Sequence, residues 1–95
     1  MSREDILTIL RDHKNSLKPL KIKSLSVFGS TARDEAGSES DIDLLIEFSE
    51  TVGLFHFVRT RRHLEELLGR NVDLVTPDAL LPELKDQILR DAIRV

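Results

Sequence analysis

The chain has 95 residues, and its 14 lysines and arginines against 17 aspartates and glutamates give a net charge of −3. This length predicts one domain spanning residues 1–95. The slight negative charge argues against a protein that binds nucleic acid by neutralising phosphates, and the absence of cysteine excludes disulfides and thiolate sites. No apolar run approaches the roughly 20 residues of a membrane span, and residues 1–10 lack the apolar core of a signal peptide. We therefore expect a cytoplasmic protein without a membrane partner.

A helix is predicted to begin at Ser2 and to end before Pro19. Ser2 is a favoured first cap and Asp5 follows three residues later, the spacing of a reciprocal cap. Apolar residues recur at helical spacing through this segment, namely Ile6, Leu7, Leu10 and Leu17. The lysines that follow, Lys18, Lys21 and Lys23, indicate a solvated link to the next element.

A Gly-Ser pair follows the first predicted strand. Residues 25–28 are a short apolar run typical of a buried strand, and Gly29 and Ser30 end it. Glycine allows a sharp turn with close backbone approach, and Ser30 is the expected N-cap of a short helix over Thr31 to Glu35. The free N–H groups at such a turn favour phosphate, to which Arg33 would add charge.

The stretch 41–48, DIDLLIEF, is predicted to be a second strand after a loop marked by Gly37, Ser38 and Ser40. Its alternation places Asp41 and Asp43 on one face and the residues Ile42, Leu44, Ile46 and Phe48 on the other. Two carboxylates this close repel each other unless a cation neutralises them, and Mg²⁺ prefers such oxygen ligands. The short strand 71–75 carries a third candidate, Asp73, which joins the same face if the two strands pair.

A long helix is predicted from about Leu54 to Leu68, with Gly69 as its stop. Its apolar side comprises Leu54, Phe57, Val58, Leu64, Leu67 and Leu68. Its other side carries Arg59, Arg61 and Arg62, which we interpret as a solvated face; contact with phosphate or an acidic partner is the sharper alternative. The histidines lack a matching ligand set, so we interpret His13, His56 and His63 as surface or packing residues.

The last helix is predicted to follow Pro82 and to run to about Ile93, after a turn that begins at Thr76-Pro77. Leu84, Ile88 and Ala92 would face inward, although this amphipathic segment could instead present apolar surface to a partner.

These residues resemble a known family. Gly29-Ser30, ten intervening residues, Asp41-x-Asp43 and a later Asp73 within a short apolar strand are similar to the signature of the DNA polymerase beta nucleotidyltransferase superfamily. Size and layout most resemble its minimal nucleotidyltransferases (MNT), the antitoxin half of bacterial and archaeal HEPN/MNT toxin–antitoxin pairs, and the resemblance covers nearly the whole chain. We expect an α/β fold with a small mixed sheet of three or four strands, helices on one face and the acidic cluster at one end of the sheet.

The resemblance also implies a chemistry. ATP would place its terminal phosphates at Gly29 and Ser30, and Asp41 and Asp43 would hold one or two Mg²⁺ ions. Asp73 would help to bind the metal nearer the acceptor and assist deprotonation of a hydroxyl. The implied product is AMP on a tyrosine of a cognate HEPN ribonuclease toxin, which is thereby silenced and with which the chain would form a hetero-oligomer.

Three alternatives stay open at this stage. The first is an antitoxin that blocks its toxin by contact alone, with a vestigial nucleotide site. The second is a nucleotidyltransferase for a small molecule such as an aminoglycoside, disfavoured because so short a chain lacks an obvious acceptor-binding domain. The third is a DNA-binding regulator, disfavoured by the charge balance and by the absence of a recognisable reader motif.

Overall fold

The computed structural model describes residues 1–35, 37 and 40–95 of the chain. The loop residue Ser38, expected from the sequence, therefore lies outside the described residues. The longer helices are α1 (Arg3–Asp12), α4 (Leu54–Leu68) and α5 (Pro82–Asp91), and the strands are β1 (Ile22–Val27), β2 (Ile42–Phe48), β3 (Val72–Val75) and β4 (Ile93–Arg94). The shorter helical segments are α2 (Lys14–Leu17), η1 (Lys18–Leu20), α3 (Gly29–Ala32) and η2 (Pro77–Ala79).

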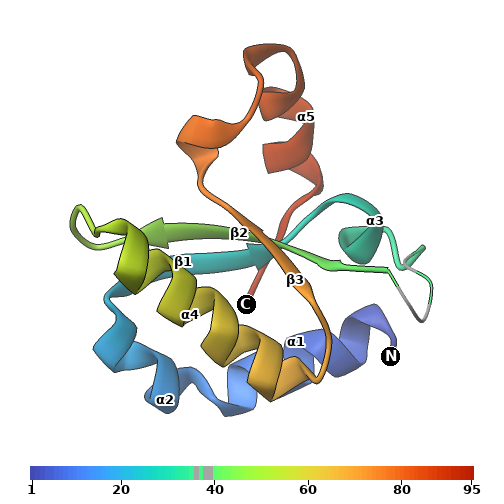
Figure 1. The fold of residues 1–95 in the computed structure, drawn as a ribbon. Coiled ribbons are helices and arrows are strands. Elements are labelled where there is room, and N and C mark those ends of the chain that lie inside the picture. Colours follow the sequence, from blue (N-terminus) through green and yellow to red (C-terminus); the bar gives the residue numbers. More distant parts are fainter. Residues whose placement is uncertain (36, 38–39) are drawn as a thin grey trace.

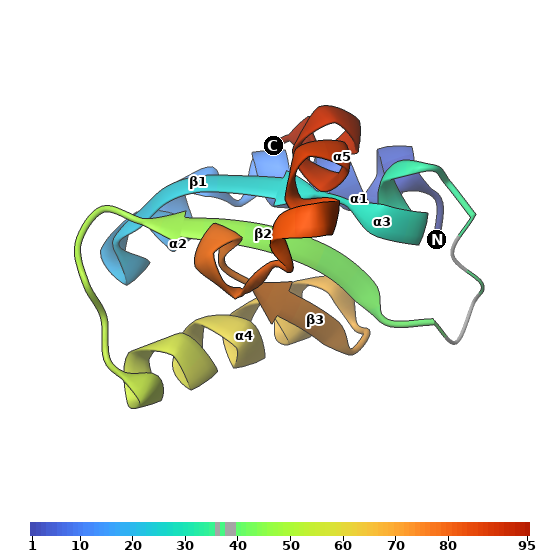
Figure 2. The same cartoon turned by 90° about the horizontal axis from the view of Figure 1, so that it is seen from above.

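Within the described residues the strands form one mixed four-stranded sheet in the order β3-β2-β1-β4 (Figures 1 and 2). Strand β1 pairs antiparallel with both β2 and β4, whereas β2 and β3 run parallel. The parallel pair is connected by α4, because parallel neighbours need a crossover rather than a hairpin. The α/β fold with a small mixed sheet is thus confirmed.

The hydrophobic core lies between the sheet and the helices α1 and α4 beneath it (Figure 1). The even-numbered residues of β2 from Ile42 to Ile46 point into this core and are fully buried, as the alternation predicted. Helices α1 and α4 contribute Ile6, Leu10 and Leu64, each at most 2% exposed. Helix α5 stands on the other side of the sheet, over the face that carries the odd-numbered residues of β2 (Figure 2).

The helix ends follow local signals in the sequence. The Ser2 hydroxyl accepts from the Asp5 N–H at 3.2 Å, and the Asp5 carboxylate accepts from the Ser2 N–H at 3.1 Å. Helix α4 has the predicted bounds, and Gly69 ends it in the left-handed conformation with φ 66°. The predicted first helix, by contrast, breaks at His13 into α1 and α2.

Further details of the sequence prediction are wrong. Ser30 is not an N-cap, because Gly29 already begins α3 and Phe28 is the cap residue. The last helix ends at Asp91, and Ile93–Arg94 form β4 against β1 instead of a final helical turn. Leu84, expected to face inward, is 48% exposed, and Leu54, assigned to the apolar side of its helix, is 73% exposed.

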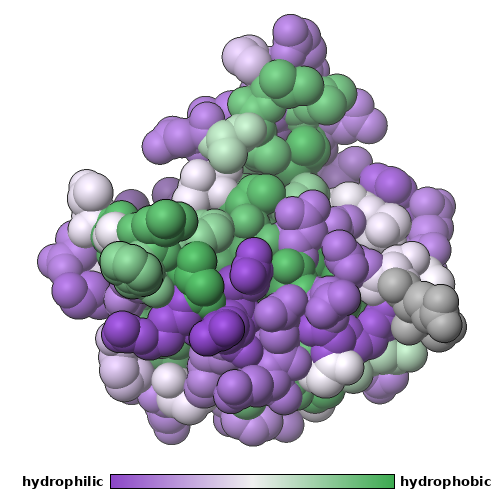
Figure 3. All heavy atoms as spheres, viewed as in Figure 1, coloured by the Kyte–Doolittle hydropathy of each residue, from purple (hydrophilic) through white to green (hydrophobic). Residues whose placement is uncertain are grey.

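The exposed apolar side chains gather in two places. Figure 3 shows hydrophobic residues over α5 and at the beginning of α4. Among the described residues, no helix combines the length and the apolar character that crossing a membrane requires.

Candidate active site

The parallel pairing of β2 and β3 brings two of the predicted carboxylates together. Asp43 lies directly beside Asp73 in the register of the two strands. In-register neighbours on adjacent strands share one face of the sheet, about 4.8 Å apart. The prediction that Asp73 joins the face of Asp43 if the two strands pair is therefore confirmed.

Gly29 leaves the space that the Asp43 carboxylate occupies. A Cβ atom at position 29 would lie 2.7 Å from Asp43 Oδ2, closer than any ordinary contact. Gly29 also has φ 58°, in the left-handed region where a side chain is disfavoured. The next residue, Ser30, donates from its hydroxyl to the same Oδ2 at 3.4 Å. The Gly-Ser turn and the Asp43 carboxylate thus form one unit.

A buried threonine fixes that unit to β2. Thr31 Oγ1 accepts from the Asp43 N–H at 3.0 Å, and the Thr31 side chain is 1% exposed. On the same stretch, the Phe28 N–H donates to the Asp43 carbonyl at 3.1 Å. Sequence reasoning missed Thr31, because its partner lies twelve residues further along the chain.

The first helix holds the other end of α3. The Arg3 N–H donates to Asp34 Oδ1, and Arg3 Nη1 donates to the Ala32 carbonyl, both at 2.9 Å. Asp34 adopts φ 58°, so the chain reverses there despite the presence of a side chain. These contacts join the N-terminal segment to the helix that carries Ser30 and Thr31.

The electrostatics of the site favour a bound cation. Burial raises the pKa of Asp43, and the charges of Asp73 and Asp41 raise it further, while the hydrogen bond from Ser30 opposes the rise. Negative charge thus accumulates at a half-buried position that has no cationic side chain within salt-bridge distance among the described residues. The available donors are carboxylate oxygens, the ligands that Mg²⁺ prefers.

One predicted carboxylate stands apart from the pair formed by Asp43 and Asp73. Asp41 is exposed and precedes β2 by one residue. Within the described part of the chain, no three acidic or histidine side chains converge into a ready-made metal cluster. Asp43 and Asp73 form the centre of the candidate site, and Asp41 lies at its edge.

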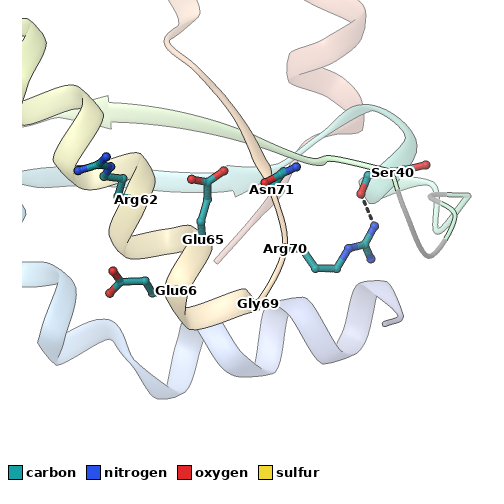
Figure 4. Close-up of a pocket in the computed structure, with 7 residues that line it drawn as sticks. All are labelled: Ser40, Arg62, Glu65, Glu66, Gly69, Arg70 and Asn71. Atoms are coloured by element: carbon teal, nitrogen blue, oxygen red, sulfur yellow. Dashed lines mark hydrogen bonds between the residues drawn. The ribbon is translucent and has the colours of Figure 1, made fainter.

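Two arginines near the site make contacts that the sequence did not predict. The exposed Arg33 forms an ion pair with Glu35, with 3.1 Å between Nε and Oε2. Arg70, which the sequence did not single out, donates to the Gly37 carbonyl at 2.8 Å and also to the Ser40 carbonyl (Figure 4). Arg70 therefore ties the loop ahead of Asp41 to the segment that leads into β3.

An open pocket lies beside the beginnings of β2 and β3, and its lining includes none of the three aspartates. Glu65 at its wall accepts from the Val72 N–H at 3.0 Å, so α4 fixes the start of the strand that carries Asp73. Figure 4 shows the residues that line this pocket, which are Ser40, Arg62, Glu65, Glu66, Gly69, Arg70 and Asn71.

The histidines take packing positions. His56 Nε2 lies 2.6 Å from the Leu20 carbonyl, and its ring packs edge-on against Phe48. His13 Nδ1 lies 2.7 Å from the Ile9 carbonyl, and His63 Nε2 is buried without a partner among the described residues. Their interpretation as packing or surface residues agrees with these contacts.

Comparison with known proteins places this geometry in a family. Residues 5–95 match the family model described as a nucleotidyltransferase domain. A protein of Methanocaldococcus jannaschii, provisionally named a protein adenylyltransferase, is 45% identical over 93 residues, covering 96% of this chain and 95% of the relative. The protein adenylyltransferase MntA of Thermococcus cleftensis is 36% identical over 96 residues, covering 100% and 97%.

Solved structures agree with the sequence relatives. One provisionally named as a minimal nucleotidyltransferase superposes with a TM-score of 0.85 at 37% identity, covering 100% of this chain and 97% of that one. Two more distant structures, each 22% identical, share the fold. One is a toxin–antitoxin structure with AMP-PNP (TM-score 0.67, covering 99% and 72%), and the other is a tri-AMPylated Shewanella oneidensis HEPN toxin with its MNT antitoxin (TM-score 0.57, covering 97% and 66%). The chain therefore belongs to the nucleotidyltransferase domain family and is an enzyme of its minimal type.

Proposed function

We propose that this chain transfers AMP from ATP, with Mg²⁺ and with release of pyrophosphate, to a tyrosine hydroxyl of a cognate HEPN toxin and thereby neutralises the toxin. The observation that carries the proposal is the placement of Asp43, in register with Asp73 and against the side-chain-free Gly29. A phosphate chain needs close backbone approach on one side and a carboxylate-held cation on the other. The Gly-Ser turn and the carboxylate pair supply these two requirements side by side.

Each residue has a defined task in this proposal. Gly29 and Ser30 would receive the terminal phosphates of ATP through the backbone N–H groups of their turn and through the Ser30 hydroxyl, which in this structure donates to Asp43. Asp43 and Asp73, with Asp41 at the edge, would hold the Mg²⁺, which when bound stabilises negative charge on phosphate oxygens. Asp73 is exposed and would also accept the proton of the acceptor hydroxyl. Arg33, exposed and paired with Glu35, would add positive charge near the phosphates.

The partner is proposed from the relatives. Proteins 36–45% identical to this chain over nearly its full length carry the name protein adenylyltransferase. The fold is shared with an MNT antitoxin in complex with an AMPylated HEPN toxin. Both facts favour a protein acceptor over a small molecule.

The test combines ATP labelled at its α-phosphate, Mg²⁺, this protein and, as the candidate toxin, the product of the adjacent gene. Label should appear on the toxin and should be lost with Asp43→Asn and with Asp73→Asn. Asp86→Asn is the matched control, because Asp86 is an exposed aspartate on α5 and should leave labelling unchanged.

The labelling result separates transfer from inhibition by contact. If the toxin stays unlabelled yet is neutralised equally by the wild type and by Asp43→Asn, the chain acts by binding alone and the proposal is wrong. Label that reaches the toxin but persists in both aspartate variants would likewise contradict the assigned roles.

A further inference from the structure

A groove lies far along β2 from the carboxylate pair, between the ends of β2 and β3 and the beginning of α4. Its volume is about 700 Å³. The lining residues Ile46 and Thr76 each lie three residues beyond a candidate-site carboxylate, Asp43 or Asp73, so the groove begins about 10 Å along the strands from the candidate site. The apolar residues of its lining are Ile46, Phe48, Val52, Leu54, Phe57 and Pro77, and the acidic ones are Glu47, Glu50 and Asp78.

A protrusion of opposite character stands next to this groove. Phe55, in the first turn of α4, is 85% exposed, the largest exposure among the large apolar side chains of the described chain. Arg59 and Arg62 follow at the spacing of one helix stripe, and both are exposed. Neither arginine forms an ion pair with another described residue. The beginning of α4 thus presents an apolar knob backed by unpaired positive charge.

We propose that this surface joins two copies of the chain in a two-fold symmetric dimer. Phe55 of one copy enters the groove of the other, and Arg59 lies against its acidic edge at Asp78 and Glu47. An isologous interface requires one patch to carry both complementary halves, and this patch does so: apolar and basic where it protrudes, apolar and acidic where it recedes.

The charges at the edge of the groove support a second copy as the occupant. Glu50 is already paired with Lys21 at 2.5 Å, whereas Asp78 forms no ion pair among the described residues. In the dimer, Arg59 of one copy, which has no ion-pair partner among the described residues of its own chain, therefore meets the similarly unpaired carboxylate of Asp78 on the other copy. The groove lining includes neither Asp43 nor Asp73 and neither of the exposed leucines of α5, Leu84 and Leu89, so this dimer does not depend on the proposed transfer.

The first test is the mass of the full-length protein by sedimentation equilibrium, between about 1 and 200 μM, a range that resolves micromolar dissociation constants. The wild type should be dimeric at the upper end. Phe55→Asp should weaken association by about 30-fold or more, as expected for a central aromatic anchor. Because Phe55 is so exposed, this variant should keep its fold, which circular dichroism checks.

The matched control is Leu89→Asp, which places the same charge at an exposed leucine of α5 and should leave the dimer intact. A wild-type chain that is monomeric throughout the range overturns the proposal and leaves the groove to a different protein. A dimer that tolerates Phe55→Asp, or that Leu89→Asp dissociates, overturns it as well.

A charge exchange tests the pairing. Arg59→Glu and Asp78→Arg should each weaken the dimer, and the double variant should regain affinity because the pair is restored with its signs reversed. A double variant weaker than both single ones would overturn the assigned contact.

Discussion

Replacing Gly29 by alanine adds a single methyl group at the point where the turn meets the carboxylate. The new Cβ would lie 2.7 Å from Asp43 Oδ2, so the carboxylate must retreat by about 0.7 Å to reach ordinary contact at 3.4 Å. The left-handed φ of 58° adds a conformational cost of about 1–2 kcal/mol for any residue with a side chain. Together with about 1 kcal/mol for the forced contact, the expected loss of stability is about 2–3 kcal/mol.

Gly69→Ala is the matched control, because Gly69 has φ 66° and a Cβ there would meet nothing within 4 Å. Urea denaturation should show that Gly69→Ala lowers the free energy of unfolding only by the conformational cost of the left-handed φ, about 1–2 kcal/mol. This variant should label the toxin as the wild type does. Gly29→Ala should lose more, and its transfer rate should fall by up to about 100-fold because the carboxylate is displaced. Equal stability losses in the two variants, with transfer retained in Gly29→Ala, would refute the close contact as a constraint on the site.

Three further predictions concern single side chains. Burial and the neighbouring carboxylates raise the pKa of Asp43, so its negative charge destabilises the metal-free fold at pH values above that pKa. Asp43→Asn should therefore raise the free energy of unfolding, measured in EDTA at neutral pH, by a few tenths to about 1 kcal/mol. This gain in stability should shrink as the pH falls through the pKa of Asp43. A variant less stable than the wild type at every pH would contradict this account. Thr31→Val leaves the Asp43 N–H without its acceptor and should cost about 1–3 kcal/mol by urea denaturation, most of which Thr31→Ser should recover. Ser2→Ala should cost about 1 kcal/mol through loss of the reciprocal cap, and an unchanged melting temperature would show that the N-terminus of α1 is held by Arg3 instead.

The parts predicted from sequence are those with local causes. The alternation in 41–48 depends only on the pleat of a strand, and α4 ends at Gly69 because a left-handed residue terminates a helix wherever it packs. The resemblance to the family signature placed Gly29 and Asp43 in one site, whereas their direct contact was not predicted. The family resemblance supplied the rest of the chemistry.

The parts missed depend on contacts between distant segments. Strand β4 has only two residues, too few for any periodicity, and exists because β1 offers it hydrogen bonds. Thr31 and Arg70 act on partners at least twelve residues away, so their neighbours in sequence say nothing of their roles. Leu54 continues the apolar pattern of α4, but as the first residue of the helix it lies outside the core cluster and is 73% exposed.

The position of β3 at the edge of the sheet affects how the site opens. Asp73 stands on a four-residue strand with a neighbour on one side only, so fraying of that strand would part the carboxylates while β1 and β2 stay paired. A ligand held by both carboxylates opposes this fraying, so part of its binding energy goes into closing the sheet. The amide hydrogens of 72–75 should therefore exchange measurably more slowly when the site is filled, which makes the edge strand a built-in reporter of occupancy.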